Sequence, residues 1–176
     1  TSAGRYDGNR TTDERMRNVY ICRTAVPDDY PVISRFPLSA EELFRVHPSA
    51  SYPWTPQQIE ETLKTRWCPT VVVHDGRPVG YANFYGYEEG KHCSLGNVII
   101  ESAHRGKGAA QHLVETMIRL AKNEMKVPKL MLVCHSDNPR ALLFYAKMGF
   151  RPTTVGKIKT PDNRVVASIT MSMTLP

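Results

Sequence analysis

The sequence lacks the cysteine pairs that mark metal sites and redox centres. Cys22, Cys68, Cys93 and Cys134 show no Cys-x-x-Cys spacing, which excludes a zinc knuckle and a dithiol redox motif. The chain also has no apolar run close to the roughly 20 residues that span a bilayer, and its first residues lack the apolar core of a signal peptide. We therefore expect a cytoplasmic protein with reduced thiols, no bound metal and no membrane partner.

Two common phosphate-binding motifs are also missing. No Gly-Lys-Ser or Gly-Lys-Thr occurs, and Gln111 stands where G-x-G-x-x-G would need its third glycine. Instead, an apolar run from Leu95 to Ile100 leads into Arg105-Gly-Lys-Gly-Ala-Ala110, at the start of an amphipathic helix. Glycines let backbone N–H groups approach a phosphate closely, and the positive end of the helix dipole lies at the same place. This turn therefore predicts a binding site for a pyrophosphate.

The chain does not show the aromatic and basic strand pattern of RNA-binding modules, although its net charge is +6. The basic residues are dispersed, and the longest local cluster (Lys157, Lys159 and Arg164) straddles a predicted hairpin turn. We expect a solvated basic surface, no nucleic-acid partner, and a modest positive field that attracts polyanionic ligands. A basic nucleic-acid-binding module remains an alternative.

A second segment, later in the chain, indicates which kind of protein the glycine turn belongs to. It reads Asn138-Pro-Arg-Ala-Leu-Leu-Phe-Tyr-Ala-Lys-Met-Gly-Phe150. In this order, R-x-x-G-x-A, a helix, a strand and N-x-x-A-x-x-x-Y-x-x-x-G-F resemble the GNAT superfamily of N-acetyltransferases, over residues 94–150. The stretches 74–85 and 95–97 are similar to a bacterial subgroup reported to acetylate peptide lysines. Ser102 departs from the pattern, because many relatives have proline there.

The resemblance implies an enzyme that uses acetyl-CoA as co-substrate, without a metal, and acetylates a primary amine. It implies that the pyrophosphate binds the 105–110 turn and that the pantetheine arm pairs with the end of the preceding strand. It also implies that Tyr145 is the general acid that protonates the departing thiolate. The implied cofactor-binding residues are Val98, Ile99, Ile100, Arg105, Gly106, Lys107, Gly108, Ala109, Ala110, Asn138 and Tyr145. A non-catalytic acyl-CoA sensor is a second alternative.

The general base and the acceptor remain open at this point. Attack on the thioester requires a neutral amine, and near neutral pH only about one lysine in a thousand is neutral. The titratable or polar residues near strand ends are Glu101, Ser94, His92 and His74, and none of them is favoured as the base. The aromatic residues Phe36, Tyr52, Trp54 and Tyr81 to Tyr87 form either a core or an acceptor pocket. A peptide lysine, a polyamine, an aminoglycoside and an amino-acid derivative all remain possible acceptors.

Alternating apolar residues, turn signals and helix caps divide the chain into strands and helices. The predicted strands cover residues 19–25, 70–74, 79–87, 92–100, 130–134, 151–159 and 165–174, and the predicted helices 28–35, 39–48, 55–65, 108–124 and 138–149. The strand at 130–134 is continuously apolar, so we expect both of its faces to be covered.

These elements predict an α/β fold with one central β-α-β crossover over residues 92–134. In detail, we expect a GNAT-like mixed, mostly antiparallel sheet of about six or seven strands, with about four helices. Residues 1–17 are polar and are expected to form a flexible arm. Residues 18–176 are expected to form one acetyltransferase domain, either monomeric or homodimeric.

Overall fold

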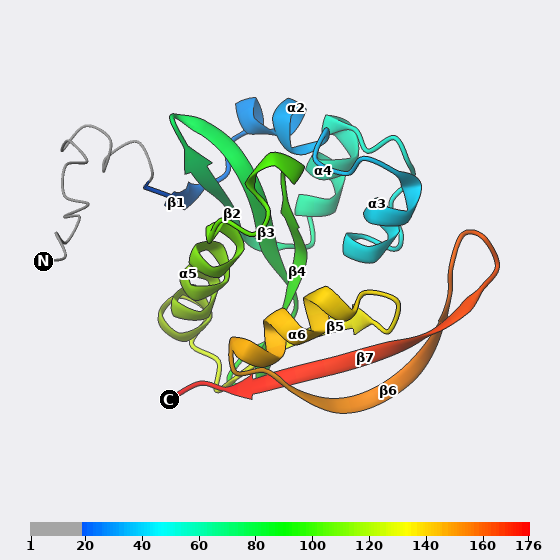
Figure 1. Cartoon of the computed structure of the whole chain (residues 1–176). Coiled ribbons are helices and arrows are strands. Elements are labelled where there is room, and N and C mark those ends of the chain that lie inside the picture. The colour runs from blue at the N-terminus through cyan, green and yellow to red at the C-terminus, as the bar shows by residue number, and fades with distance from the viewer. Residues whose placement is uncertain (1–18) are drawn as a thin grey trace, which may run out of the picture.

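A seven-stranded sheet runs through the computed structural model, which describes residues 19–176 (Figure 1). The strand order is β1-β2-β3-β4-β5-β7-β6. The strands are β1 (Ile21–Thr24), β2 (Trp67–His74), β3 (Arg77–Glu88), β4 (His92–Ile100), β5 (Lys129–His135), β6 (Arg151–Lys159) and β7 (Val165–Thr174). The predicted arm at 1–17 lies outside the described residues.

The sheet is mostly antiparallel, with a single parallel pair at its centre. β1 to β4 form an antiparallel meander, and β5, β7 and β6 form a second antiparallel group. β4 and β5 are parallel, because the chain returns between them through helix α5 (Ala109–Asn123). The predicted fold class is confirmed.

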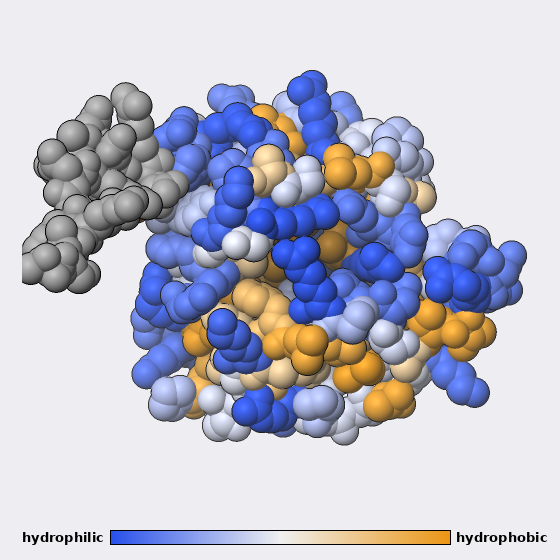
Figure 2. Space-filling model, viewed as in Figure 1, coloured by the Kyte–Doolittle hydropathy of each residue, from blue (hydrophilic) through white to orange (hydrophobic). Residues whose placement is uncertain are grey.

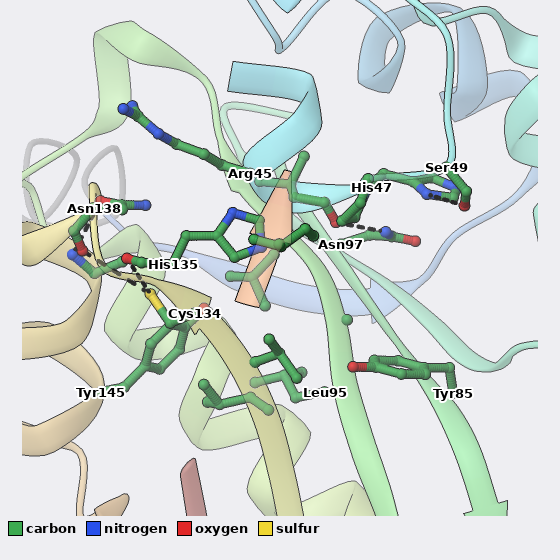
Figure 3. A pocket seen from close by; sticks show the side chains of 18 of the residues that line it. Arg45, His47, Ser49, Tyr85, Leu95, Asn97, Cys134, His135, Asn138 and Tyr145 are labelled. Carbon is green, nitrogen blue, oxygen red and sulfur yellow. Dashed lines mark hydrogen bonds between the residues drawn. The ribbon is translucent and has the colours of Figure 1, made fainter. Parts of the chain in front are cut away.

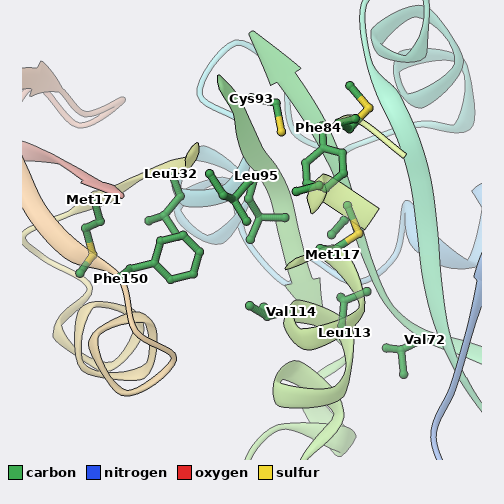
Figure 4. Close-up of a cluster of buried hydrophobic side chains, with 14 of the residues drawn as sticks. Val72, Phe84, Cys93, Leu95, Leu113, Val114, Met117, Leu132, Phe150 and Met171 are labelled. Carbon is green, nitrogen blue, oxygen red and sulfur yellow. The ribbon is translucent and has the colours of Figure 1, made fainter. Parts of the chain in front are cut away.

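Helices cover both faces of the meander. Because successive strand residues point to opposite sides of the sheet, neighbouring residues of one strand enter different cores. Val72 belongs to the larger core, together with Leu113 of α5 (Figure 4). Its neighbour Val71 belongs to a second core, together with Leu43 of α3. The helices besides α5 are α2 (Tyr30–Ile33), α3 (Ala40–Val46), α4 (Pro56–Leu63) and α6 (Pro139–Lys147), and 3-10 turns cover Pro27–Asp29 and Ser102–His104.

Side-chain caps begin helices α3, α4 and α6. The side chains of Ser39, Thr55 and Asn138 accept hydrogen bonds from the backbone three residues later, at 3.1, 3.2 and 3.3 Å. The Glu42 carboxylate accepts from the Leu38 N–H at 3.0 Å, one residue earlier than in the usual capping box. Among residues 19–176, no helix has the length and apolar character needed to cross a membrane.

The expectation that both faces of β5 are covered is wrong. Leu132 is 2% exposed, but its neighbour Val133 is 42% exposed. Val133 faces a cavity between β4 and β5, so an apolar side chain on this strand does not require a covering helix.

The burial of Leu113 in the larger core predicts how strongly its truncation lowers the free energy of unfolding. Leu113 is fully buried, whereas Leu143 on α6 is 72% exposed. Leu113→Ala should lower the free energy of unfolding by about 2–5 kcal/mol, because it removes buried methyl groups and leaves a cavity. The matched control Leu143→Ala should change it by less than about 0.5 kcal/mol. Chemical denaturation of both variants measures the difference, and similar values would contradict the assigned core.

Candidate functional site

The parallel strands β4 and β5 separate soon after they meet. They pair at only two positions, Cys93 with Leu130 and Ser94 with Met131. From Leu95 onward, the edge of β4 that faces β5 has no strand partner among the described residues. Its backbone N–H and C=O groups therefore remain available for a ligand.

A β-bulge bends β4 at this point. Tyr81 pairs with Ile99 and Asn83 with Gly96, so β4 has one more residue than β3 between these pairs. Asn97 lies in this extra stretch and has a φ of 51°, a left-handed conformation that asparagine adopts more readily than most residues. The bulge turns the free edge of β4 toward the space between the strands.

Buried amides hold the bulge in place. The Asn97 side chain donates to the carbonyl of Val46, at the end of α3, and accepts from Asn83 Nδ2, both at 2.8 Å. Asn83 also contacts the Tyr81 hydroxyl at 3.0 Å. Asn83 and Asn97 are 0% and 5% exposed, and buried amides are stable only when they are hydrogen-bonded.

Two adjoining cavities occupy the space between the separated strands. The larger, of about 650 Å³, extends to the glycine turn before α5, and the smaller, of about 380 Å³, lies beside α3 and the end of β5. Both are lined by Val98, Asn138 and Tyr145. Figure 2 shows this face hollowed at its centre, with an apolar floor framed by hydrophilic side chains.

The glycine turn has the backbone that the sequence suggested. Gly106 and Gly108 have φ values of 71° and 93°, a region that most other residues avoid. A Cβ on Gly108 would meet nothing within 4 Å, and one on Gly106 would lie 3.5 Å from Arg140 Nη2. The conformation, rather than crowding inside the protein, therefore requires these glycines. Arg140 and Lys147 also line the larger cavity and bring positive charge to it.

Arg105 forms contacts within the protein. Its guanidinium binds both carboxylate oxygens of Glu42, at 3.1 and 3.2 Å, and its Nε donates to the carbonyl of Ile100 at 3.0 Å. This pairing holds the pKa of Glu42 below its usual range. Much of the charge that the sequence analysis assigned to the phosphate is therefore balanced by Glu42, and Arg105 joins the turn to α3.

Most of the predicted cofactor-binding residues line the larger cavity, and two do not. Those that line it are Val98, Ile99, Ile100, Arg105, Gly106, Gly108, Ala110, Asn138 and Tyr145. Ala109 is fully buried in the core, and the Lys107 side chain is exposed to solvent. Because both belong to the turn, their backbone contact with a phosphate stays a prediction.

Tyr145 lines both cavities, and Figure 3 shows its ring at the smaller one. Its ring packs against those of Phe144 and Phe150, with centroids 5.3 and 5.8 Å away. Burial raises the pKa of its phenol, so Tyr145 is a neutral proton donor at physiological pH.

The four candidate bases from the sequence, Glu101, Ser94, His92 and His74, line neither cavity. Two histidines that the sequence analysis missed, His47 and His135, line the smaller one. Burial lowers the pKa of His135, and its Nδ1 is buried without a hydrogen-bond partner among the described residues. In the sequence, the position of His135 just before the Asn138 motif was the signal that could have placed it at the site.

His47 is held in its neutral form. The Thr62 hydroxyl donates to the carbonyl of Gln58 at 2.8 Å, so His47 Nε2 donates to Thr62 at 3.0 Å and Nδ1 accepts from Ser49 at 3.3 Å. Burial, and then the charge of Arg66, lower the pKa of His47 to about 4. The imidazole is therefore uncharged at neutral pH.

Comparisons with known proteins give one matching sequence family and several similar solved structures. A sequence model described as the acetyltransferase (GNAT) family matches residues 37–150. Similar solved structures include a putative phosphinothricin N-acetyltransferase, with 21% identity over 90% of this chain and 99% of that chain, and a TM-score of 0.75. Another is the spermidine N-acetyltransferase from Vibrio cholerae in complex with CoA and spermine, with 16% identity over 89% and 95% of the chains and a TM-score of 0.75.

A third similar structure is yncA, a putative acetyltransferase from Salmonella typhimurium with its cofactor acetyl-CoA. It has 18% identity over 90% of this chain and 95% of that chain, and a TM-score of 0.69. At these identities, the three structures show a shared fold.

The neutral state of His47 predicts a pH dependence of stability. The unfolded chain binds a proton at His47 below pH about 6.5, but the folded chain does so only near pH 4. The contribution of His47 is therefore complete above pH 6.5, and it falls by up to about 1.4 kcal/mol per pH unit as the pH decreases toward 4.

The variant His47→Gln should unfold with a shallower pH dependence than the wild type across this window. Urea denaturation at several pH values measures it, and the other acid-sensitive groups cancel in the comparison because both proteins contain them. Equal slopes would show that His47 does not remain neutral in the folded protein.

Proposed function

Because the chain belongs to the acetyltransferase (GNAT) family, we propose that it transfers the acetyl group of acetyl-CoA to a primary amine, with Tyr145 as the general acid. Acetyl-CoA is the co-substrate of this family, and the amine is a peptide lysine or a small molecule. The observation that carries the proposal is the groove between β4 and β5, which runs from the glycine turn to the Tyr145 hydroxyl.

The larger cavity suits a coenzyme A molecule. The N–H groups of the 106–110 turn and the dipole of α5 favour a pyrophosphate at this end. Arg140 and Lys147 line the same cavity and add positive charge. The open space beside Gly108 leaves room for the phosphate.

The free edge of β4 suits the pantetheine arm. This arm contains two amides and resembles a short peptide, so it can pair with a strand that lacks a partner. The bulge at Asn97 and the end of the β4–β5 pairing at Ser94 leave Val98 to Ile100 free for such pairing. The thioester then lies near Tyr145, at the junction of the two cavities.

Acetyl-CoA supplies the activated acetyl group, and the side chains supply position and protons. The acceptor amine, bound in the smaller cavity, gives up a proton to solvent water, and its nitrogen forms a bond to the thioester carbon. The carbon–sulfur bond breaks, and Tyr145 donates its phenolic proton to the departing thiolate. Because its pKa is raised, Tyr145 is protonated before the reaction begins.

The phosphate assignment is tested by a pair of glycine variants. Gly108 and Gly90 both have positive φ values, 93° and 68°, and a Cβ on either would meet nothing within 4 Å. Asp tolerates this conformation better than most residues, so both Asp variants should fold. Gly108→Asp should weaken acetyl-CoA binding at least about tenfold, because its carboxylate repels the pyrophosphate.

Calorimetry with acetyl-CoA measures the effect. Gly90→Asp, in the β3–β4 turn and away from both cavities, should bind acetyl-CoA like the wild type. Unchanged affinity in a folded Gly108→Asp variant would place the pyrophosphate elsewhere.

The acid assignment is tested by Tyr145→Phe, which keeps the ring and removes the proton donor. General acid catalysis contributes about 10²–10⁴ in rate, so kcat should fall at least roughly tenfold while acetyl-CoA affinity changes little. Tyr87 lines neither cavity, so the control variant Tyr87→Phe should keep full activity. A thiol-release assay measures both, and a fully active Tyr145→Phe enzyme would make Tyr145 a packing residue.

A further inference from the structure

The smaller cavity contains positive charge but no carboxylate among its lining residues. Two arginines line it, Arg45 and Arg66. Arg45 is balanced by acidic neighbours, with Glu41 at 2.7 Å and Asp137 at 3.5 Å. In the described part of the chain, no carboxylate pairs with Arg66, and burial lowers the pKa of its guanidinium.

The fold holds the Arg66 side chain in a defined place. Its Nη1 donates to Asn83 Oδ1 at 3.3 Å, and its guanidinium lies over the Tyr85 ring, 4.6 Å from the centroid. Gly96 makes this possible, because a Cβ there would lie 2.8 Å from Arg66 Nη1 and 2.7 Å from the Tyr85 ring. Two contacts from β3, and the space that Gly96 of β4 leaves, therefore position the guanidinium.

A half-buried charge without a counterion is costly, and burial lowers the pKa of the Arg66 guanidinium. Arginine nevertheless remains charged at any physiological pH. The neighbouring His47 stays neutral, so it does not add to this charge. The remaining donor positions of the guanidinium are suited to an anion, which they can bind with two parallel hydrogen bonds.

We propose that Arg66 binds an anionic group of the acceptor, and that the acceptor is therefore an amine that also carries a carboxylate or a similar anion, such as an amino-acid derivative. The proposal rests on the proposed function, because Tyr145 lines the same cavity and marks the place where the amine reacts. Polyamines fit this cavity poorly, since no lining carboxylate is available to bind a second ammonium group.

Matched substrates test the proposal on the wild-type protein. Each pair consists of an amino acid and its amide, with spacings from glycine to 6-aminohexanoate, and spermidine serves as a polycationic probe. For at least one pair, kcat/KM should be about 10- to 100-fold higher for the carboxylate, the usual effect of a charge-assisted hydrogen bond. Amides have the more easily deprotonated amine, so chemistry alone favours the opposite order. Equal rates within every pair, or spermidine as the best acceptor, would overturn the proposal.

Variants then identify the residue. Arg66→Gln should remove the preference within the pair, mainly by raising KM for the carboxylate, and Arg66→Lys should keep part of it because the positive charge remains. Arg119 is an exposed residue of α5 that lines neither cavity. The control variant Arg119→Gln makes the same change in net charge and should keep the preference. A preference that survives in Arg66→Gln would contradict the role of Arg66.

Binding measurements separate this proposal from the proposed function. The N-acetylated products of each pair are titrated into the complex of the protein with CoA. Tighter binding of the carboxylate product to the wild type than to Arg66→Gln supports the anion site even if no transfer is detected, in which case only the proposed function fails. Equal binding of carboxylate and amide products would overturn the anion site, whether or not transfer occurs.

Discussion

The early separation of β4 and β5 is the constraint on which the rest of the site depends. After two paired positions, the bulge at Asn97 turns β4 away, and the sheet opens instead of closing. An open sheet leaves backbone groups that need partners and apolar side chains, such as Val133, that lack cover. Both features are unfavourable in a closed fold, and both are features that the proposed binding of a peptide-like ligand and an acceptor requires.

Helix α3 bridges this opening at three points. At its start, Glu42 binds Arg105 next to the glycine turn. At its end, the carbonyl of Val46 accepts from Asn97 in the bulge, and Arg45 reaches Asp137 ahead of α6. A helix of seven residues gains little stability from its own hydrogen bonds, so these contacts with both sides of the groove hold it there. The same contacts give the groove its shape.

Local patterns predicted the elements well, and long-range contacts explain what they missed. The strands at 92–100, 151–159 and 165–174 have the predicted bounds, because turns and alternation are properties of neighbouring residues. The pairing of Arg105 with Glu42 joins residues 63 apart in sequence, and Arg66 reaches Asn83 across 17 residues. No local pattern contains such contacts. The motif assigned Arg105 to the phosphate, whereas the fold also uses it as an anchor.

In the proposed reaction, the charges of the smaller cavity affect how easily the acceptor amine loses its proton. Removing the proton of a lysine-like ammonium near neutral pH costs roughly 4 kcal/mol. Burial and a nearby positive charge both favour the neutral amine, and Arg66 supplies that charge without a carboxylate to cancel it. An acceptor's own carboxylate would oppose this effect by favouring the ammonium form. By pairing with that carboxylate, Arg66 would both place the acceptor and lower the free energy needed to deprotonate its amine.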